Sequence, residues 1–140
     1  MRSVTLSPAA LLLLLACSPD APETRIRKAF DGAVKAVEAG DATAAIEILD
    51  DGFRGPEDMN KAAARVYLMG WFRSEKVGVT VVAQKLEVRG TQAWQQVDLL
   101  LTGRTGRSVL PQESSRRTLQ LRWELSGKTW RVKELGIEGA

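Results

Sequence analysis

The chain has the size and composition of one globular domain. It contains 140 residues, 44% of them hydrophobic, with 20 Lys and Arg against 17 Asp and Glu. This near balance of charge argues against a dedicated nucleic-acid-binding protein, which usually concentrates basic residues on one face. Histidine is absent from the sequence and there is a single cysteine. His-based acid–base catalysis, Ser-His and Cys-His nucleophiles, an internal disulfide and most transition-metal sites are therefore excluded.

The first 17 residues have the pattern of a cleaved export signal. Arg2 precedes an apolar stretch from Leu6 to Leu15, which is too short to span a bilayer and is followed by Ala16 and Cys17. The run Leu14-Leu15-Ala16-Cys17 resembles the lipobox of bacterial lipoproteins. The resemblance implies that residues 1–16 are removed and that Cys17 carries the acyl chains, palmitate among them, that attach the protein to a membrane. An ordinary secretory signal with an incidental cysteine is the alternative.

Residues 17–23 are expected to form the lipidated cysteine and a short tether. Pro19 and Pro22 stand here among small and polar residues, which disfavours a helix. The lipoprotein resemblance also bears on location, because Asp after the lipidated cysteine favours the inner membrane of Gram-negative bacteria. Ser18 occupies that position, which implies the outer membrane, with the domain facing the periplasm.

Three amphipathic helices are predicted in the first half of the domain. The first covers residues 24–39 and ends at Gly40, the second follows Asp41 as its cap, and the third covers residues 59–73. Apolar residues at helical spacing form one face of each helix. These faces consist of Ile26, Phe30, Val34 and Val37 in the first, Ala42, Ala45, Ile46 and Leu49 in the second, and Met59, Ala63, Val66 and Gly70 in the third. The second helix is expected to end at Asp50-Asp51-Gly52.

From Val77 onward the apolar residues alternate with a period of about two, which predicts strands. The predicted strands cover residues 77–88, 93–102, 116–125 and 129–137. Tight hairpin signals at Arg89-Gly90 and Ser126-Gly127-Lys128 predict antiparallel neighbours. The third strand alternates most clearly, and its inward residues are Leu119, Leu121, Trp123 and Leu125. We expect one face of the sheet to be buried and the other to be wet.

Three helices followed by an antiparallel meander predict an α+β fold in which helices cover one face of a curved sheet. In this order, residues 24–137 resemble the nuclear transport factor 2-like superfamily, a cone-like fold. The resemblance rests on the break Ala39-Gly40-Asp41, the exit Leu49-Asp50-Asp51-Gly52-Phe53 and the closing hairpin Gly127-Lys128-Thr129-Trp130-Arg131-Val132. These features are structural and are shared by members with many functions, so the fold alone implies no activity.

Members that resemble ketosteroid isomerase carry a general-base Asp before a proline, an Asp on a late strand and a tyrosine on the first helix. The matching positions in this chain are Gly55, Leu121 and Ala33. The resemblance therefore implies that the isomerase site is lost, and no catalytic residue is expected. Asp98 and Glu134 are the carboxylates on later strands that remain as substitutes, although alternation directs Asp98 outward with Trp94 and Gln96.

Two sets of residues are candidate binding groups. An apolar pocket with aromatic walls suits a small apolar ligand, with ordinary core packing as the alternative. The pocket candidates are Tyr67, Trp71, Trp123 and Trp130. Arginines around one loop suit carboxylate or phosphate groups, with a solvated loop as the alternative. The anion-site candidates are Arg104, Arg107, Arg116 and Arg117.

The sequence thus predicts a lipid-anchored binding or accessory module of the cell envelope, facing the periplasm, without catalysis, cofactor or metal. A small apolar ligand and a homodimer through the sheet are the partners left open, and nucleic acid is not expected. One alternative is an isomerase- or dehydratase-type enzyme with Asp98 or Glu134 inside a dry pocket. Another is a protein-interaction lipoprotein that uses the outer sheet face around Trp94, which a closed core would favour.

Overall fold

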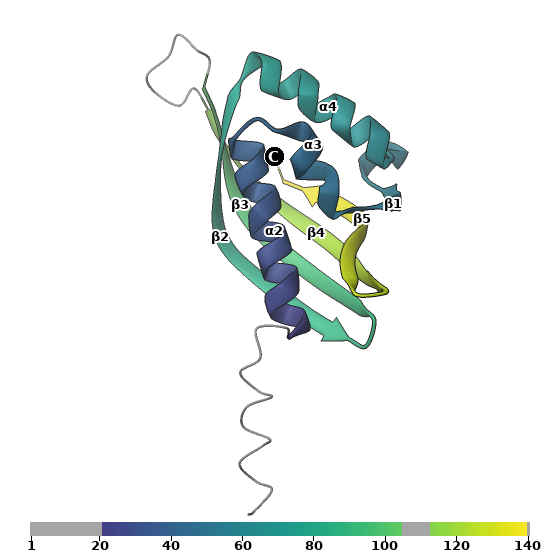
Figure 1. The fold of residues 1–140 in the computed structure, drawn as a ribbon. Coiled ribbons are helices and arrows are strands. Elements are labelled where there is room, and N and C mark those ends of the chain that lie inside the picture. The colour runs from purple at the N-terminus through teal and green to yellow at the C-terminus, as the bar shows by residue number, and fades with distance from the viewer. Residues whose placement is uncertain (1–20, 105–112, 140) are drawn as a thin grey trace, which may run out of the picture.

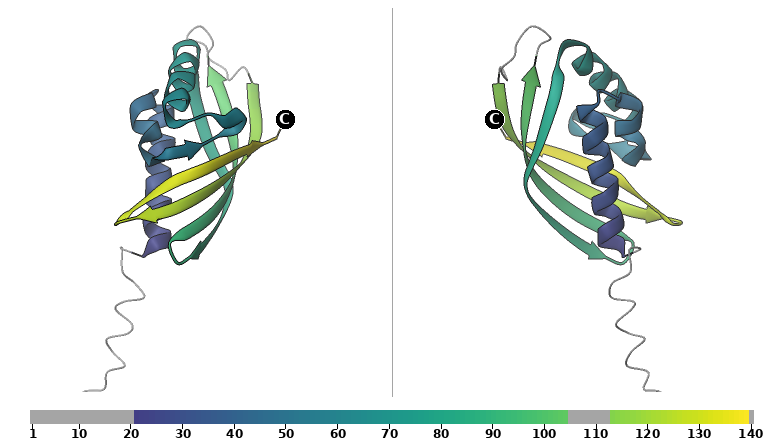
Figure 2. Two further views of the ribbon diagram at one scale, coloured as in Figure 1. Left: turned by 90° about the vertical axis from the view of Figure 1, so that its right-hand side faces the viewer. Right: turned by 60° about the vertical axis from the view of Figure 1, so that its left-hand side comes forward.

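Helices lie against one face of a five-stranded sheet (Figure 1, Figure 2). The computed structural model describes residues 21–104 and 113–139. The elements in chain order are α2 (Pro22–Glu38), α3 (Ala42–Ala45), the 3-10 turn η1 (Ile46–Ile48), β1 (Leu49–Arg54), the 3-10 turn η2 (Pro56–Asp58), α4 (Lys61–Ser74), β2 (Lys76–Arg89), β3 (Gln92–Arg104), β4 (Glu113–Ser126) and β5 (Thr129–Glu138). The predicted α+β class, with helices on one face of the sheet, is confirmed.

The first helix, α2, follows the sequence prediction closely. It begins at Pro22, inside the segment expected to be tether, because proline is compatible with the first turn of a helix. Ile26 and Phe30 are buried against the sheet. Gly40 ends the helix in the left-handed region, with a φ of 72°, as predicted for a C′ glycine. Within residues 21–104 and 113–139, no helix is long and apolar enough to cross a membrane.

The second helix is shorter than predicted and is followed by a strand that the sequence analysis missed. The carboxylate of Asp41 caps α3 by accepting a hydrogen bond from the Ala44 N–H at 3.0 Å. The chain then extends into β1 instead of continuing the helix to Leu49. Leu49 and Phe53 are buried, and Leu49 lies opposite Val132 in a parallel pairing with β5. The sheet is therefore mixed, not purely antiparallel.

The predicted meander β2–β3–β4–β5 is confirmed, with antiparallel pairing between successive strands. The strand order β1-β5-β4-β3-β2 leaves β2 at an edge of the sheet. Its pairing with β3 is interrupted by a bulge, because Val81 lies opposite Leu99 and Ala83 opposite Asp98. Val82 is the extra residue, and half of its surface is exposed. Near the bulge, the Glu38 carboxylate of α2 accepts a hydrogen bond from the Val79 N–H at 3.5 Å.

The face of the sheet toward the helices is filled by side chains. Trp123 on β4 has no exposed surface, and its indole Nε1 donates a hydrogen bond to Oε1 of Gln95 on β3 at 2.9 Å. Gln95 is also buried, and its Nε2 donates to Oε1 of Gln84 on β2 at 3.2 Å. These bonds satisfy polar groups that would be costly to bury alone. The inward direction predicted for Trp123 is confirmed.

The apolar face predicted for the third helix is not the face that packs. Ala64 is buried and Leu68 packs against the core, whereas Val66 is 66% exposed and Tyr67 is 61% exposed. Apolar residues lie all along Lys61–Ser74, so more than one stripe fits the helical period. The face that packs is therefore set by the contacts of α4 with α3 and β1.

The new strand β1 is held to β5 by a partly buried acidic group, Asp50. The Asp50 carboxylate accepts a hydrogen bond from the Gly52 N–H at 2.7 Å and lies 3.0 Å from the Lys133 ammonium. The hydrogen bond from the Gly52 N–H has the largest effect on the pKa of Asp50, and the bond from Lys133 has the next largest. Both hold this pKa below its usual range. A carboxyl group with a lowered pKa in the folded state stabilises that state above about pH 4 and loses this contribution as the pH falls further.

Replacement of Trp123 by Ala should lower the free energy of unfolding by about 3–5 kcal/mol, because it opens a cavity and removes the partner of Gln95. Urea unfolding followed by circular dichroism measures the loss. Trp94→Ala on the opposite face is the matched control and should cost less than about 1 kcal/mol. Equal losses for the two variants would contradict the inward assignment of Trp123.

Asp50→Asn should destabilise the protein more at pH 7 than at pH 3, because the wild-type carboxylate loses its advantage when it is protonated. The measurement is urea unfolding of both proteins at the two pH values. Asp51→Asn is the neighbouring control, since that side chain is fully exposed and lies 3.6 Å from Lys61. A penalty for Asp50→Asn that stays constant with pH would contradict the role given to the Asp50 carboxylate.

Candidate functional site

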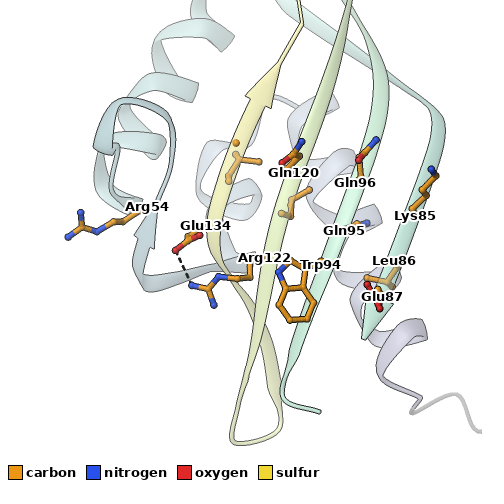
Figure 3. A pocket seen from close by; sticks show the side chains of 13 residues that line it. Arg54, Lys85, Leu86, Glu87, Trp94, Gln95, Gln96, Gln120, Arg122 and Glu134 are labelled. Atoms are coloured by element: carbon orange, nitrogen blue, oxygen red, sulfur yellow. Dashed lines mark hydrogen bonds and ion pairs between the residues drawn. The ribbon is translucent and has the colours of Figure 1, made fainter. Parts of the chain in front are cut away.

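A hollow of about 890 Å³ lies on the sheet face that points away from the helices. Its floor is built from two rows of side chains that cross β2, β3, β4 and β5 (Figure 3). One row consists of Glu87, Trp94, Arg122 and Glu134, and the next consists of Lys85, Gln96, Gln120 and Gly136. Because side chains alternate along each strand, these rows share the outer face. The hollow therefore belongs to the wet face of the sheet, not to the core.

The second row leaves more open space than the first, because its last residue is a glycine. Gly136 adds no side chain beside Gln120, and a methyl group placed there would lie 4.0 Å from the Gln120 Cβ. The amides of Gln96 and Gln120 lie on directly paired strand positions in the middle of the hollow. Each amide offers two donors and one acceptor. The centre of the hollow thus carries two amides, with Lys85 beside Gln96 and with Gln120 Nε2 donating a hydrogen bond to the Glu138 carboxylate at 3.3 Å.

The first row contains an ion pair between Arg122 and Glu134. Arg122 Nη2 donates a hydrogen bond to the Glu134 carboxylate at 3.1 Å (Figure 3). Arg122 Nη1 also lies 3.5 Å from the Glu124 carboxylate. The hydrogen bond from Arg122 holds the pKa of Glu134 below its usual range, and Glu134 raises the pKa of Arg122. Both groups are therefore charged near neutral pH and neutralise one another.

Trp94 is the exposed aromatic residue of the hollow, with 41% of its surface accessible. The guanidinium carbon of Arg89 lies 5.9 Å from the centroid of its ring. Arg89 is itself fixed by the Glu87 carboxylate, which accepts bonds from Nε at 2.9 Å and Nη2 at 2.7 Å. This contact limits the positions open to the indole ring.

The four aromatic pocket candidates are not gathered around a cavity. Tyr67 is exposed on α4, and Trp71 is half-buried with its Nε1 donating to the Glu75 carboxylate at 3.0 Å. Trp123 and Trp130 are buried in the core. Tyr67 and Trp71 thus lie on α4, whereas Trp123 and Trp130 lie together in the core as packing groups.

The anion-site candidates are described only in part. Arg107 lies outside the described residues, and Arg104 ends β3. Arg116 and Arg117 are consecutive residues of β4, so their side chains leave opposite faces of the strand. Arg117 Nη1 donates to the Arg116 carbonyl at 3.0 Å. A site that uses both side chains on one face is therefore disfavoured by the strand geometry.

The residues weighed for catalysis lie where a core pocket cannot use them. Leu121 is buried among apolar side chains and Gly55 packs beside the Phe53 ring. Asp98 lies on the outer-face row opposite Thr118, whose hydroxyl donates to it at 2.7 Å, and Glu134 binds Arg122. Among residues 21–104 and 113–139, no three His, Cys, Asp or Glu side chains are grouped to hold a metal.

A second hollow, of about 440 Å³, lies between the loop before α3 and the helix α4. Arg65, Met69, Phe72 and Arg73 line it from α4. Arg65 Nε donates to the Thr43 hydroxyl at 3.1 Å. This bond joins α3 to α4 and gives the Arg65 side chain a structural use.

Sequence reasoning missed the hollow that the structure forms. Alternation placed Trp94 and Gln96 on the outer face, and the same pattern applied to β4 and β5 would have placed Gln120, Arg122 and Glu134 beside them. The missing information was the register between strands, which brings Gly136 next to Gln120. A glycine inside a predicted strand is the signal that could have indicated it.

Comparison with solved structures identifies the architecture. A putative scytalone dehydratase from Novosphingobium aromaticivorans superposes with a TM-score of 0.73 at 9% identity, over 96% of this chain and 89% of that one. An NTF2-like protein of unknown function from Pseudomonas putida superposes with a TM-score of 0.71 at 13% identity, over 84% of this chain and 86% of that one. A putative aromatic ring hydroxylase from N. aromaticivorans superposes with a TM-score of 0.69 at 10% identity, over 82% of this chain and 86% of that one.

No protein-family model and no curated protein matches the sequence. At identities of 9–13% the structural likeness concerns the arrangement of the chain and not the chemistry of a site. These superpositions agree with the observed architecture, in which helices cover one sheet face and strands β2–β5 form a meander. The chain therefore has the nuclear transport factor 2-like fold.

Proposed function

We propose that this protein is a lipid-anchored binding module of the bacterial cell envelope that holds its ligand on the outer face of the sheet and catalyses no reaction. One observation carries the proposal: the inner face is packed with Trp123 and Gln95, while the outer face has an open hollow around Trp94. A volume of about 890 Å³ lies within the range of roughly 300–1,000 Å³ typical of ligand sites.

The positions of the carboxylates support a role without catalysis. General acid–base chemistry needs a group of suitable pKa within reach of a bound substrate. Glu134 is paired with Arg122, which lowers its pKa and keeps it ionised. Asp98 accepts a hydrogen bond from Thr118 on the outer face. The names of the hydroxylase- and dehydratase-like neighbours favour an enzyme, but the core of this chain holds Leu121 and Trp123 where such a pocket would lie.

The lipid anchor and the periplasmic location rest on the sequence Leu14-Leu15-Ala16-Cys17 and on Ser18. We expect Cys17→Ser to remove the protein from the membrane fraction, because the lipid supplies the attachment and stable anchoring needs more than one acyl chain. Fractionation of cells with intact-mass analysis of the mature protein measures both the location and the modification. A wild-type mature protein with a free Cys17 thiol would contradict the anchor.

The outer face should meet the ligand in the cell. A photoreactive amino acid in place of Lys85, which is exposed at the edge of the hollow, should form adducts in living cells, because this position borders a ligand held there. The same residue in place of Val66 is the matched control, since Val66 is 66% exposed on α4 at a different surface. Adducts are measured as mass shifts of the purified protein. Equal labelling at both positions, or labelling at Val66 alone, would contradict the proposed binding face.

A further inference from the structure

We infer that the ligand of the outer hollow is a neutral glycan chain, one sugar ring of which stacks on Trp94 while its hydroxyl groups bind Gln96 and Gln120. The inference rests on the proposed function and names the ligand class of that site. Three properties of the hollow carry it: an exposed aromatic ring, two amides at its centre, and arginines that are already paired with carboxylates.

The aromatic ring provides an apolar platform in a polar hollow. The face of an indole ring carries partial negative charge, and the axial C–H groups of a pyranose ring carry partial positive charge, so the two stack favourably. Trp94 is 41% exposed, and the Arg89 guanidinium lies over one face of its ring. The sugar ring therefore stacks on the other face or takes the place of this exposed guanidinium.

The amides match the hydrogen-bonding character of sugar hydroxyls. A hydroxyl both donates and accepts, and so does the amide of Gln96 or Gln120. The two amides lie on paired positions of β3 and β4, one row away from Trp94. A sugar ring on Trp94 therefore extends its hydroxyls toward the amides, and the space above Gly136 leaves room for the chain to continue across β5.

The charges around the hollow disfavour ionic ligands. Arg122 is neutralised by Glu134 at 3.1 Å, and Arg89 by Glu87 at 2.7 Å. Arg54, at the rim, lies 3.5 Å from Asp58. Lys85 also lines the hollow and forms no ion pair with the described residues, but phosphate and nucleic-acid ligands are bound through clusters of free cations and would have to break the arginine pairs as well. A ligand without charge leaves them intact.

A second copy of the chain fits the hollow less well than a glycan. In a two-fold dimer the same patch meets itself, so the two hollows would face one another and enclose a void. An empty space at an interface forfeits the contacts of its lining atoms. A chain of sugar rings fills the hollow instead.

The test measures binding of chitotetraose, cellotetraose and maltotetraose to the mature chain, in a detergent without a sugar headgroup. Protein NMR and intrinsic tryptophan fluorescence report the binding. We expect at least one of the three to bind, and Trp94→Ala to weaken its binding about tenfold or more. Trp94→Phe should restore part of the affinity because it retains an aromatic platform. Tyr67→Ala, which removes an exposed aromatic residue on α4, should change the affinity less than about twofold.

Gly136→Leu provides an independent test, because it fills the hollow from a strand position where an added Cβ meets Gln120 at an ordinary 4.0 Å. It should abolish glycan binding while the circular dichroism spectrum and melting temperature stay close to those of the wild type. If Gly136→Leu does not fold, Gln96→Leu tests the amide centre, and it should weaken binding by a similar factor.

The outcomes separate the glycan inference from the proposed function. Absence of binding to all three oligosaccharides, or binding that survives both Trp94→Ala and Gly136→Leu, overturns the glycan inference. If the photoreactive Lys85 variant still forms specific adducts in that case, the binding face stands and its ligand belongs to another class. A Trp94-dependent dimer in sedimentation, without glycan binding, shows that the occupant is a second copy and also overturns the inference.

Discussion

The buried hydrogen bond between Trp123 and Gln95 is the interaction on which the closed inner face of the sheet depends. An indole ring fills the space between the sheet and the helices, and the 2.9 Å bond to Gln95 satisfies its N–H there. Gln95 in turn reaches Gln84, so one chain of polar side chains crosses three strands within the core. Because burial of an unpaired polar group is costly, the three side chains stabilise one another as a set. The inner face is closed by this set, and the hollow lies on the outer face.

The alternation of side chains along β3 and β4 also determines which residues lie on the outer face. Each inward residue of β3 and β4 has an outward neighbour, so burial of Gln95 and Trp123 places Trp94, Gln96 and Arg122 toward solvent. The hollow is open because Gly136 leaves a gap beside Gln120, and it is nearly neutral because Arg122 is held by Glu134. A single substitution on β5 thus decides whether the outer face is flat or hollowed, without any change in the core.

Much of the fold could be predicted from the sequence, because the period of apolar residues is set by backbone geometry. The four long strands and α2 follow that period, and Trp123 lies inward as its alternation requires. β1 could not be found in this way, since Asp50, Asp51 and Gly52 disfavour a strand and pairing with β5 holds it in place. The exposed face of α4 was assigned wrongly because Val66 and Leu68 belong to different stripes of one largely apolar helix. The site depends on strand register, which a single sequence does not specify.

The free edge of the sheet bears on how molecules of this protein meet. β2 is 14 residues long and rich in valine, and an open strand of this kind is a template on which another chain can pair. The bulge at Val82 interrupts the regular spacing of its donors and acceptors, and the Glu38 carboxylate engages the Val79 N–H. Growth of one sheet into the next molecule, which is the first step toward fibrous aggregates, is thereby discouraged. Separate molecules can therefore lie close together while each retains its own sheet.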